Sequence, residues 1–504
     1  MNKKNIFFTF LISCIILPLQ GIGQTNKEKE STPIAFQLED IIKLAKDKSP
    51  DAKIAKHRFL INYWNYRSFK AQFLPYLEAN ATLPAYQNII TNVIQEDGSL
   101  ASRSINTFVN QAGLSLKQRI GFTNGVLGIN TNLQRTENLN FTKNGKVQFI
   151  SKPIYLSYNQ NILGYNTLRW AKKIEPLKYE ESRRKYLEEM EEVNARAVSL
   201  FFQHLQDQIS IEIAEKNIRN YDTLYKIAKG RYKLGKIAEN ELLELELNLM
   251  NARLNKEQAY ISYGNSLFQL KSFLRIKDDK NIVLIAPTPK PEEIIEIPLA
   301  KALIESKANS STTLTYQKEM LEAESNLARN RYSRYNINLN ATYGLTAEGL
   351  DIANSYKNFE ENQNITLQLN IPILNWGEYK GKIKMAQSNL DLVKTSVDQK
   401  EVDYEQSIYL AVQEFNIQKN QLAIAAKSDT IAQLRYDITK KRYLIGKVND
   451  VNDLNRAQVD SDQSRKTYYE SLYTYWKNYY RIRKITLYDF EQDRQIYVNL
   501  NDLY

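Results

Sequence analysis

One motif occurs twice in this chain and divides it into two similar parts. The sequence RYKLGKI at residues 231–237 returns as RYLIGKV at residues 442–448. Two shorter matches keep the same order, 162–163 with 373–374 and 80–82 with 340–342. Three ordered matches indicate an internal duplication. The spacing of the matches places about 49 additional residues between Thr82 and Ile162 of the first copy.

Each copy is predicted to contain a leading helix, strands, a very long helix, the repeated motif as a turn, and a returning helix. The first repeat is assigned to residues 24–281 and the second to residues 299–484. Residues 282–298 contain four prolines and are interpreted as a linker. Residues 485–504 are predicted to pack on the helices as a C-terminal tail. The leading helices are expected at 38–74 and 299–332.

Long uninterrupted helices are favoured because the 504 residues include only 17 Gly and 12 Pro. Apolar residues recur every three or four positions from Leu187 to Ile209, and again from Leu390 to Phe415. This spacing predicts helices that pair by side-chain interdigitation, as in a coiled coil. A helix from Leu168 to Arg231 would be about 95 Å long. The second copy repeats it at 379–442, and returning helices are expected at 239–276 and 451–484.

Strict alternation of apolar and polar residues predicts strands. It is clearest at residues 365–371, where Ile and Leu alternate with Thr, Gln and Asn. Strands are expected at 77–94, 108–120, 126–137, 147–160, 337–347 and 363–371. This pattern suits a wall between lipid and a watery lumen, but a sheet with one wet face gives the same pattern. Six strands cannot enclose water, because even filled barrels need about eight. A channel would therefore require several copies to share one barrel.

The first 23 residues have the features of a secretory signal peptide. Lys3 and Lys4 precede an apolar run that starts at Ile6, and small residues at 21–23 favour cleavage after Gly23. The only cysteine of the chain, Cys14, lies inside this segment. Lipidation of Cys14 is the alternative, since residues 11–14 resemble a lipoprotein cleavage box. Export and the absence of other cysteines favour the barrel over the soluble sheet.

Hydropathy and charge exclude several other classes of protein. The mean hydropathy is −0.51, and beyond the signal peptide no run of about eighteen apolar residues could form a spanning helix. The net charge is +11, but Lys and Arg alternate with Glu and Asp along the helices. A nucleic-acid partner would require basic residues gathered on one face. The charges are therefore interpreted as a solvated helix surface, with no nucleic-acid partner.

The sequence contains no recognisable catalytic or metal-binding constellation. The two histidines, His57 and His204, stand alone in helical sequence, and surface or packed positions are expected for both. There is no phosphate loop and no Ser-His-Asp arrangement. We therefore expect no enzyme activity, no metal and no cofactor.

The order of these features resembles the TolC-like outer-membrane efflux family over essentially all of the mature chain. The resemblance is carried by 38–41 leading to 48–50, by Phe73-Leu74-Pro75, by 371–377, and by the two Arg-Tyr-x-x-Gly-Lys turns. It implies a mixed α and β membrane protein, a homotrimer that shares one transmembrane β-barrel continued by a long α-helical coiled-coil barrel across the periplasm. It also implies an inner-membrane pump and a periplasmic adaptor as partners, besides outer-membrane lipid.

The resemblance also implies two sets of functional residues at the helical turns. Family channels carry acidic residues six and nine positions after the second turn glycine, where this chain has Asn452 and Asn455. The family's gate arginine, two positions after that glycine, is replaced by Val448. The expected pore-gate residues are Asp450, Asn452, Asp453, Asn455, Glu241, Glu244 and Tyr443. The expected adaptor-docking residues are Arg231, Tyr232, Gly235, Lys236, Arg442, Gly446 and Lys447.

Export of small toxic compounds through a tripartite system is the leading functional hypothesis. The exit channel of a type I protein secretion system is the close alternative, and a periplasmic coiled-coil structural protein is an alternative of another class. The longer first copy is compatible with more than one number of strands in the barrel. Twelve strands in the trimer are usual for the family, whereas eighteen would result if the additional hairpin joined the wall. Alternatively, that hairpin stands outside the wall.

Overall fold

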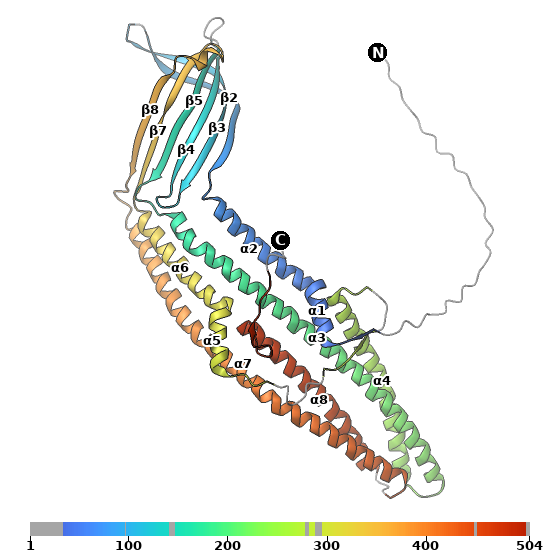
Figure 1. Cartoon of the computed structure of the whole chain (residues 1–504). Helices are drawn as coiled ribbons and strands as arrows, with labels where there is room; N and C mark the ends of the chain where they lie inside the picture. Colours follow the sequence, from blue (N-terminus) through green and yellow to red (C-terminus); the bar gives the residue numbers. More distant parts are fainter. Residues whose placement is uncertain are drawn as a thin grey trace, which may run out of the picture.

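The computed structural model describes residues 34–95, 97–140, 147–277, 282–287, 295–447 and 451–499. The predicted signal peptide, Cys14, part of the linker and Asp450 lie outside these residues. The chain is elongated, with a curved sheet at one end and helices running away from it (Figure 1). The two repeated turns lie at the end of the helices farthest from the sheet (Figure 1).

The helices occur in two series with equal lengths. The first series is α1 (Leu38–Lys48), α2 (Pro50–Ala71), α3 (Thr167–Lys233) and α4 (Glu239–Leu274), and the second is α5 (Leu299–Asn309), α6 (Ser311–Tyr332), α7 (Glu378–Leu444) and α8 (Val451–Thr486). In each series the helices have 11, 22, 67 and 36 residues. The predicted long helices and returning helices are confirmed. Equal lengths in equal order are what a duplicated unit would give.

Each leading helix is broken, so the prediction of one continuous helix in each copy was wrong. The break falls at Ser49 in the first series and at Ser310 in the second. The Ser49 hydroxyl accepts a hydrogen bond from the backbone N–H of Ala52 at 3.1 Å, and Pro50 follows at the first helical position. Ser310 accepts in the same way from Thr312. Each serine caps a new helix and thereby ends the preceding one.

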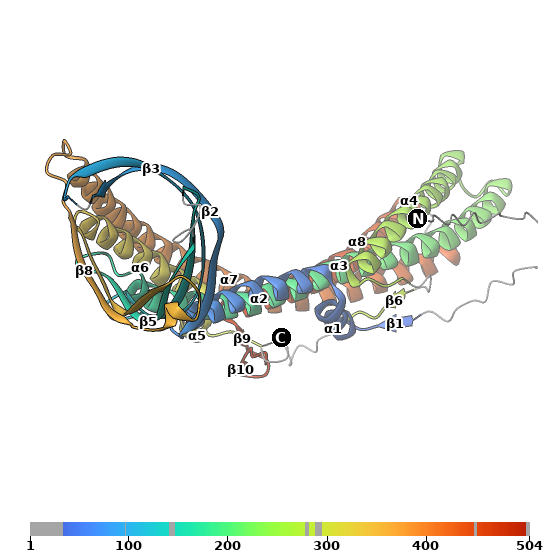
Figure 2. The same ribbon diagram turned by 90° about the horizontal axis from the view of Figure 1, so that it is seen from above.

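Six antiparallel strands form one sheet in the order β2-β3-β4-β5-β7-β8. The strands are β2 (Tyr76–Ile94), β3 (Leu100–Ile120), β4 (Gly125–Asn138), β5 (Val147–Asn161), β7 (Asn336–Gly349) and β8 (Glu360–Asn370). All six predicted strands are present, although β3 begins earlier than expected. Figure 2 shows the strands along a strongly curved surface.

The additional residues of the first copy lie within this sheet. The β3–β4 hairpin is inserted between β2 and β5, and β3 pairs with β2 over nearly its whole length. β4 pairs with β5 in the same manner on the other side. In the single chain this hairpin is therefore part of the six-stranded sheet, because both of its strands complete the ladder of backbone hydrogen bonds.

Two further strand pairs were not anticipated from the sequence. β1 (Ile34–Phe36) pairs in parallel with β6 (Ile282–Leu284), so the start of the predicted linker is a strand. β9 (Tyr488–Asp489) pairs with β10 (Arg494–Gln495) in the C-terminal tail. Buried Ile282 and Leu284 show that the β1–β6 pair packs into the core at mid-length of the helices.

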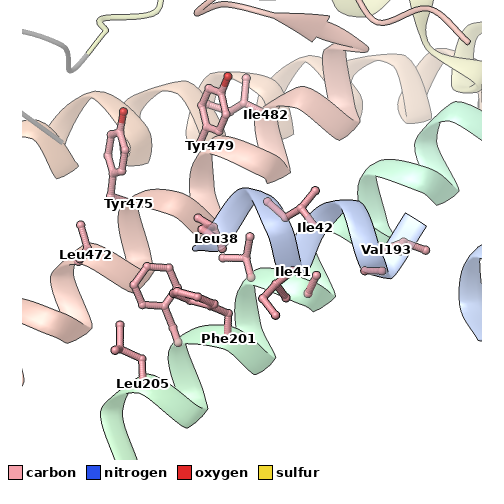
Figure 3. Packing of buried hydrophobic residues seen from close by; sticks show 14 of the residues in the cluster. Leu38, Ile41, Ile42, Val193, Phe201, Leu205, Leu472, Tyr475, Tyr479 and Ile482 are labelled. Atoms are coloured by element: carbon pink, nitrogen blue, oxygen red, sulfur yellow. The ribbon is translucent and has the colours of Figure 1, made fainter. Parts of the chain in front are cut away.

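The main core lies where α1, α3 and α8 meet (Figure 3). Val193, Phe201 and Leu205 of α3 face Leu38 and Ile41 of α1, and Leu472 and Tyr475 of α8 complete the cluster (Figure 3). The three α3 residues belong to the heptad-like spacing read from the sequence. A second cluster near the turns joins α3, α4, α7 and α8 through residues such as Tyr221, Leu245 and Tyr436.

Candidate functional site

The two faces of the sheet differ in chemistry. The backbone register aligns one residue from each of five strands in a single row, namely Leu77, Leu116, Ile129, Leu156 and Tyr343. Every side chain in this row is at least 42% exposed. Successive side chains of a strand point to opposite faces. The row is therefore the centre of an exposed apolar face, and β8 extends it with Ile365, Leu367 and Leu369.

The opposite face is polar and internally hydrogen-bonded. The Asn130 amide donates to the Ser157 hydroxyl at 2.9 Å, and Lys117 forms an ion pair with Glu78 at 2.7 Å. Asn161 donates to Asn336 at 3.0 Å. Uncharged amides and hydroxyls dominate this face, which suits contact with water.

β2 and β8 are the two ends of the sheet, and each has one edge without a strand partner among the described residues. All of β8 is exposed. An open edge carries unpaired N–H and C=O groups that can pair with another chain. Below the sheet, α2 packs on α3, α3 on α6, and α6 on α7, so the helices form one layer that continues the wall.

The two repeated turns have the same backbone hydrogen bonds. In the first, Gly235 donates to Tyr232 O at 2.9 Å and Lys236 to Arg231 O at 3.0 Å. In the second, Gly446 donates to Tyr443 O at 3.0 Å and Lys447 to Arg442 O at 3.1 Å. Both glycines have positive φ, +66° and +75°. This is the Schellman arrangement, which explains why glycine stands at that position of each motif.

Arg231 connects the two turns. Its Nη2 donates to Tyr443 O at 3.0 Å and to Leu444 O at 3.1 Å, at the C-terminal end of α7. The guanidinium also lies 5.1 Å from the centre of the Tyr443 ring. A cation at the end of a helix satisfies free carbonyls and interacts favourably with the helix dipole. The equivalent Arg442 is exposed, and the described residues provide no partner for its side chain.

The expected gate residues do not form one cluster within a single chain. Glu244 accepts a hydrogen bond from Asn455 at 2.8 Å, across the two hairpins at matched positions of the repeats. Asp453 instead lies 3.6 Å from Arg435 of α7. Asn452 is exposed, and Asp450 lies outside the described residues. The sequence did not single out Arg435, because its role depends on the packing of α7 on α8.

Tyr443 is buried at the tip, with only 1% of its surface exposed. Burial raises the pKa of its phenol, the Arg231 guanidinium opposes this, and the Glu241 carboxylate adds to it. The hydroxyl stays protonated at neutral pH and has no hydrogen-bond partner among the described residues. Glu241 Oε2 is likewise buried without one. The Tyr443 phenol, the Glu241 carboxylate and the Arg231 guanidinium therefore lie close together between the hairpins.

Most of the expected docking residues lie on the exposed surface of the turns. Tyr232, Lys236 and Lys447 are exposed, whereas Arg231 is turned inward. Sequence reasoning missed Leu234 and Ile445, which immediately precede the two turn glycines and are 72% and 65% exposed. The sequence indicated these two residues only through the apolar character that both motifs share at the position before the glycine. They give each turn an apolar contact point between basic side chains.

A polar layer separates the main core from the cluster at the tip. Asp462 of α8 accepts hydrogen bonds from Asn217 of α3 at 2.6 Å and from Gln458 at 3.2 Å. Lys216 and Ser461 both donate to Gln433 of α7. Burial raises the pKa of Asp462, although these hydrogen bonds and Lys216 oppose the shift. The layer links three helices of the two hairpins by hydrogen bonds instead of apolar packing.

We expect Asp462→Asn to stabilise the helices at neutral pH. The raised pKa means that the folded chain binds a proton more tightly than the unfolded chain. Stability therefore falls as pH rises from the usual pKa of 3.8 towards the folded value. The asparagine variant should lose this dependence in equilibrium urea unfolding between pH 4 and pH 7. An unchanged pH profile would contradict the assignment.

The histidines hold no metal site within the described residues, where no cluster of three potential ligands occurs. His204 is fully buried, with Nδ1 3.0 Å from the Ser266 hydroxyl and its ring 4.7 Å from that of Tyr263. Burial lowers the pKa of His204 to about 4, so it is neutral at physiological pH. His57 is exposed. Among the described helices, none is long and apolar enough to cross a membrane.

A family model and solved structures both relate this chain to outer-membrane efflux channels. Residues 320–486 match the family model described as outer membrane efflux protein. A search of the curated proteins found no match. The solved structure of the Campylobacter jejuni CmeC outer membrane channel is 16% identical, with a TM-score of 0.63, and the alignment covers 92% of this chain and 88% of CmeC.

Two further solved structures agree with this fold. The outer membrane protein VceC of Vibrio cholerae is 9% identical with a TM-score of 0.60, over 91% of this chain and 97% of VceC. The open state of the MtrE outer membrane channel of Neisseria gonorrhoeae is 14% identical with a TM-score of 0.54, over 92% of this chain and 91% of MtrE. The predicted resemblance is thus confirmed: this chain has the fold of the TolC-like outer-membrane efflux channels and matches their family model over residues 320–486.

Proposed function

We propose that three copies of this chain form an outer-membrane channel, a passive exit duct for small toxic compounds driven by an inner-membrane pump. The observation that carries the proposal is a sheet with an exposed apolar face, a hydrogen-bonded polar face and two open edges, mounted on a layer of helices. An exposed apolar face this large requires lipid or a partner to cover it. A wall between lipid and a wet lumen satisfies both faces at once.

The strand count sets how the wall would close. A six-stranded sheet with free β2 and β8 closes when β8 of one copy pairs with β2 of the next. Three copies then give eighteen strands, because the β3–β4 hairpin is a full member of the sheet. Barrels of sixteen to eighteen strands leave an aqueous channel. The twelve-stranded alternative would require one hairpin of each copy to leave its present pairing.

The helices would continue this wall as a tunnel across the periplasm. The secretory signal peptide predicted at residues 1–23 supports this location. At the far end, Leu234 and Ile445 with Lys236 and Lys447 offer an apolar and basic surface to helical hairpins of a periplasmic adaptor. The pump supplies the energy, and the duct supplies a polar passage without a fitted pocket. A type I secretion exit would use the same architecture.

A cross-linking experiment tests the shared barrel. Cysteines at Glu78 of β2 and at Gln368 of β8 lie on the polar face near the same end of the two open edges. With Cys14 replaced by serine if it is retained, oxidation should join copies into covalent trimers on a denaturing gel. Placing the second cysteine at 366 or 370 covers neighbouring registers.

The matched control moves the second cysteine to Asn132, on the polar face of the interior strand β4. This pair should give no link between copies. Purified protein should also conduct ions in planar bilayers. A protein that stays out of the membrane fraction, shows no conductance and forms no β2–β8 link would instead support the periplasmic structural alternative.

A further inference from the structure

A groove of about 1160 Å³ lies where the sheet meets the helices. It is bounded by the β3–β4 turn, the end of β5, the first turns of α3 and the last turns of α6. Arg169 and Lys173, one helical turn apart on α3, face Arg331 near the end of α6 across this groove. Trp170, Tyr332 and Tyr335 provide aromatic walls.

The groove has an excess of positive charge. The described residues provide no ion pair for Arg169, Lys173 or Arg331, and Glu324 is the one carboxylate along the lining. Lys173 lies 5.0 Å from the Trp170 ring, and Arg331 donates only to the neutral amide of Gln387, at 3.2 Å. The three cations are held near one another by two packed helices without a matching number of anions. This arrangement favours a phosphate group, which guanidinium and ammonium groups bind with charge-assisted hydrogen bonds.

The groove continues the apolar face of the sheet. Tyr158 and Gln160 of β5 line it, and they lie on the same face as Leu156 because side chains two positions apart share a face. Phe122 in the β3–β4 turn is 92% exposed beside it. An elongated ligand could thus place an anionic head among the cations and an apolar tail along Leu156 and Leu127. Aromatic and basic side chains are common at the interface between membrane and water.

A neighbouring copy would leave this groove open. The open edges of the sheet are β2 and β8, and the edges of the helix layer are α2 and α7. The groove instead lies over the end of β5 and between α3 and α6, in the middle of both layers. Subunits that meet through their edges therefore do not cover it.

We propose that this groove binds the headgroup of an anionic phospholipid, in the leaflet that faces the helices. The proposal rests on the membrane location given under the proposed function. Arg169, Lys173 and Arg331 would contact the phosphodiester, and the acyl chains would lie on the apolar face above. Each chain then has one such site, which fixes the height of the sheet in the membrane.

The test counts lipids on detergent-purified trimers by native mass spectrometry, with palmitoyl-oleoyl phosphatidylglycerol and phosphatidylcholine as probes. The wild type should bind one phosphatidylglycerol per chain in preference to phosphatidylcholine. The variant Arg169→Gln/Lys173→Gln/Arg331→Gln should bind phosphatidylglycerol roughly a hundredfold more weakly. The variant Arg169→Lys/Arg331→Lys should retain binding, since it keeps the charge.

The control variant Arg253→Gln/Lys394→Gln/Lys427→Gln removes the same charge from exposed positions elsewhere on the helices. It should bind lipid as the wild type does. Equal loss in both triple variants, an undiminished preference in the groove variant, or complete displacement of the lipid by inorganic phosphate would overturn the proposal. Conductance of the wild type in bilayers is measured separately, so a failure of the channel hypothesis is distinguished from a failure at this groove.

Discussion

Replacing Arg483 with methionine should destabilise the middle of the molecule by about 3–5 kcal/mol, the usual effect of breaking a buried ion pair. Arg483 of α8 donates from Nε to Glu191 of α3 at 3.0 Å, and it forms a second ion pair with Asp489 of the C-terminal tail. The side chains of Glu191 and Asp489 are only 3% and 9% exposed. Without the guanidinium, two carboxylates would remain buried with no cation between them.

The destabilisation caused by Arg483→Met should be smaller at lower pH. Burial raises the pKa of Asp489 and Arg483 lowers it, with a lowered pKa as the net result in the wild type. The ion pair therefore contributes stability above the usual pKa of 3.8 and loses it as pH falls through the lower folded value. In the variant only burial would remain from these two effects, so the Asp489 carboxyl should instead take up a proton on folding. The difference in unfolding free energy between the two proteins should be smaller at pH 5 than at pH 7.

Equilibrium urea unfolding, followed by far-ultraviolet circular dichroism, measures both effects. Lys484→Met is the matched control, because the neighbouring Lys484 forms an ion pair with Glu192 of α3 at 2.8 Å, with both side chains at least 42% exposed. An exposed pair of this kind contributes at most about 1 kcal/mol. Equal destabilisation by the two substitutions would contradict a special role for Arg483.

The helices and strands could be predicted because their signals are local. The stretch before Arg231 carries apolar residues at helical spacing, and residues 365–371 alternate strictly, so each segment specifies its own periodicity. The breaks at Ser49 and Ser310 were missed because capping by a serine competes with an otherwise continuous apolar pattern. The β1–β6 pair joins residues far apart in the sequence, and no local pattern indicates such a partner.

The candidate site was predicted less completely, because several of its contacts join residues far apart in the sequence. The turn glycines follow from the motif itself, since a Schellman turn needs a positive φ. The motif does not predict that Arg231 is turned inward while Arg442 is exposed, because the two arginines occupy the same place in nearly identical motifs. What separates them is the packing of α3 against α8, which brings only the first arginine over the end of α7. The Asp462 layer likewise depends on three helices.

If the hairpin tips form the gate of the proposed channel, Arg231→Met should weaken closure of that gate, whereas Arg442→Met should leave it unchanged. The Arg231→Met variant lacks two hydrogen bonds to carbonyls of α7 and the contact with the Tyr443 ring. The described residues provide no side-chain partner for Arg442. Hydrogen bonds of a charged group contribute about 2 kcal/mol, which corresponds to roughly a 30-fold change in the ratio of closed to open tips. Planar-bilayer recordings should show a higher open probability for the first variant only. Because the two arginines hold equivalent places in the repeats and carry the same charge, an identical increase in both variants would assign the effect to charge at the tip and refute a contact that holds the hairpins together.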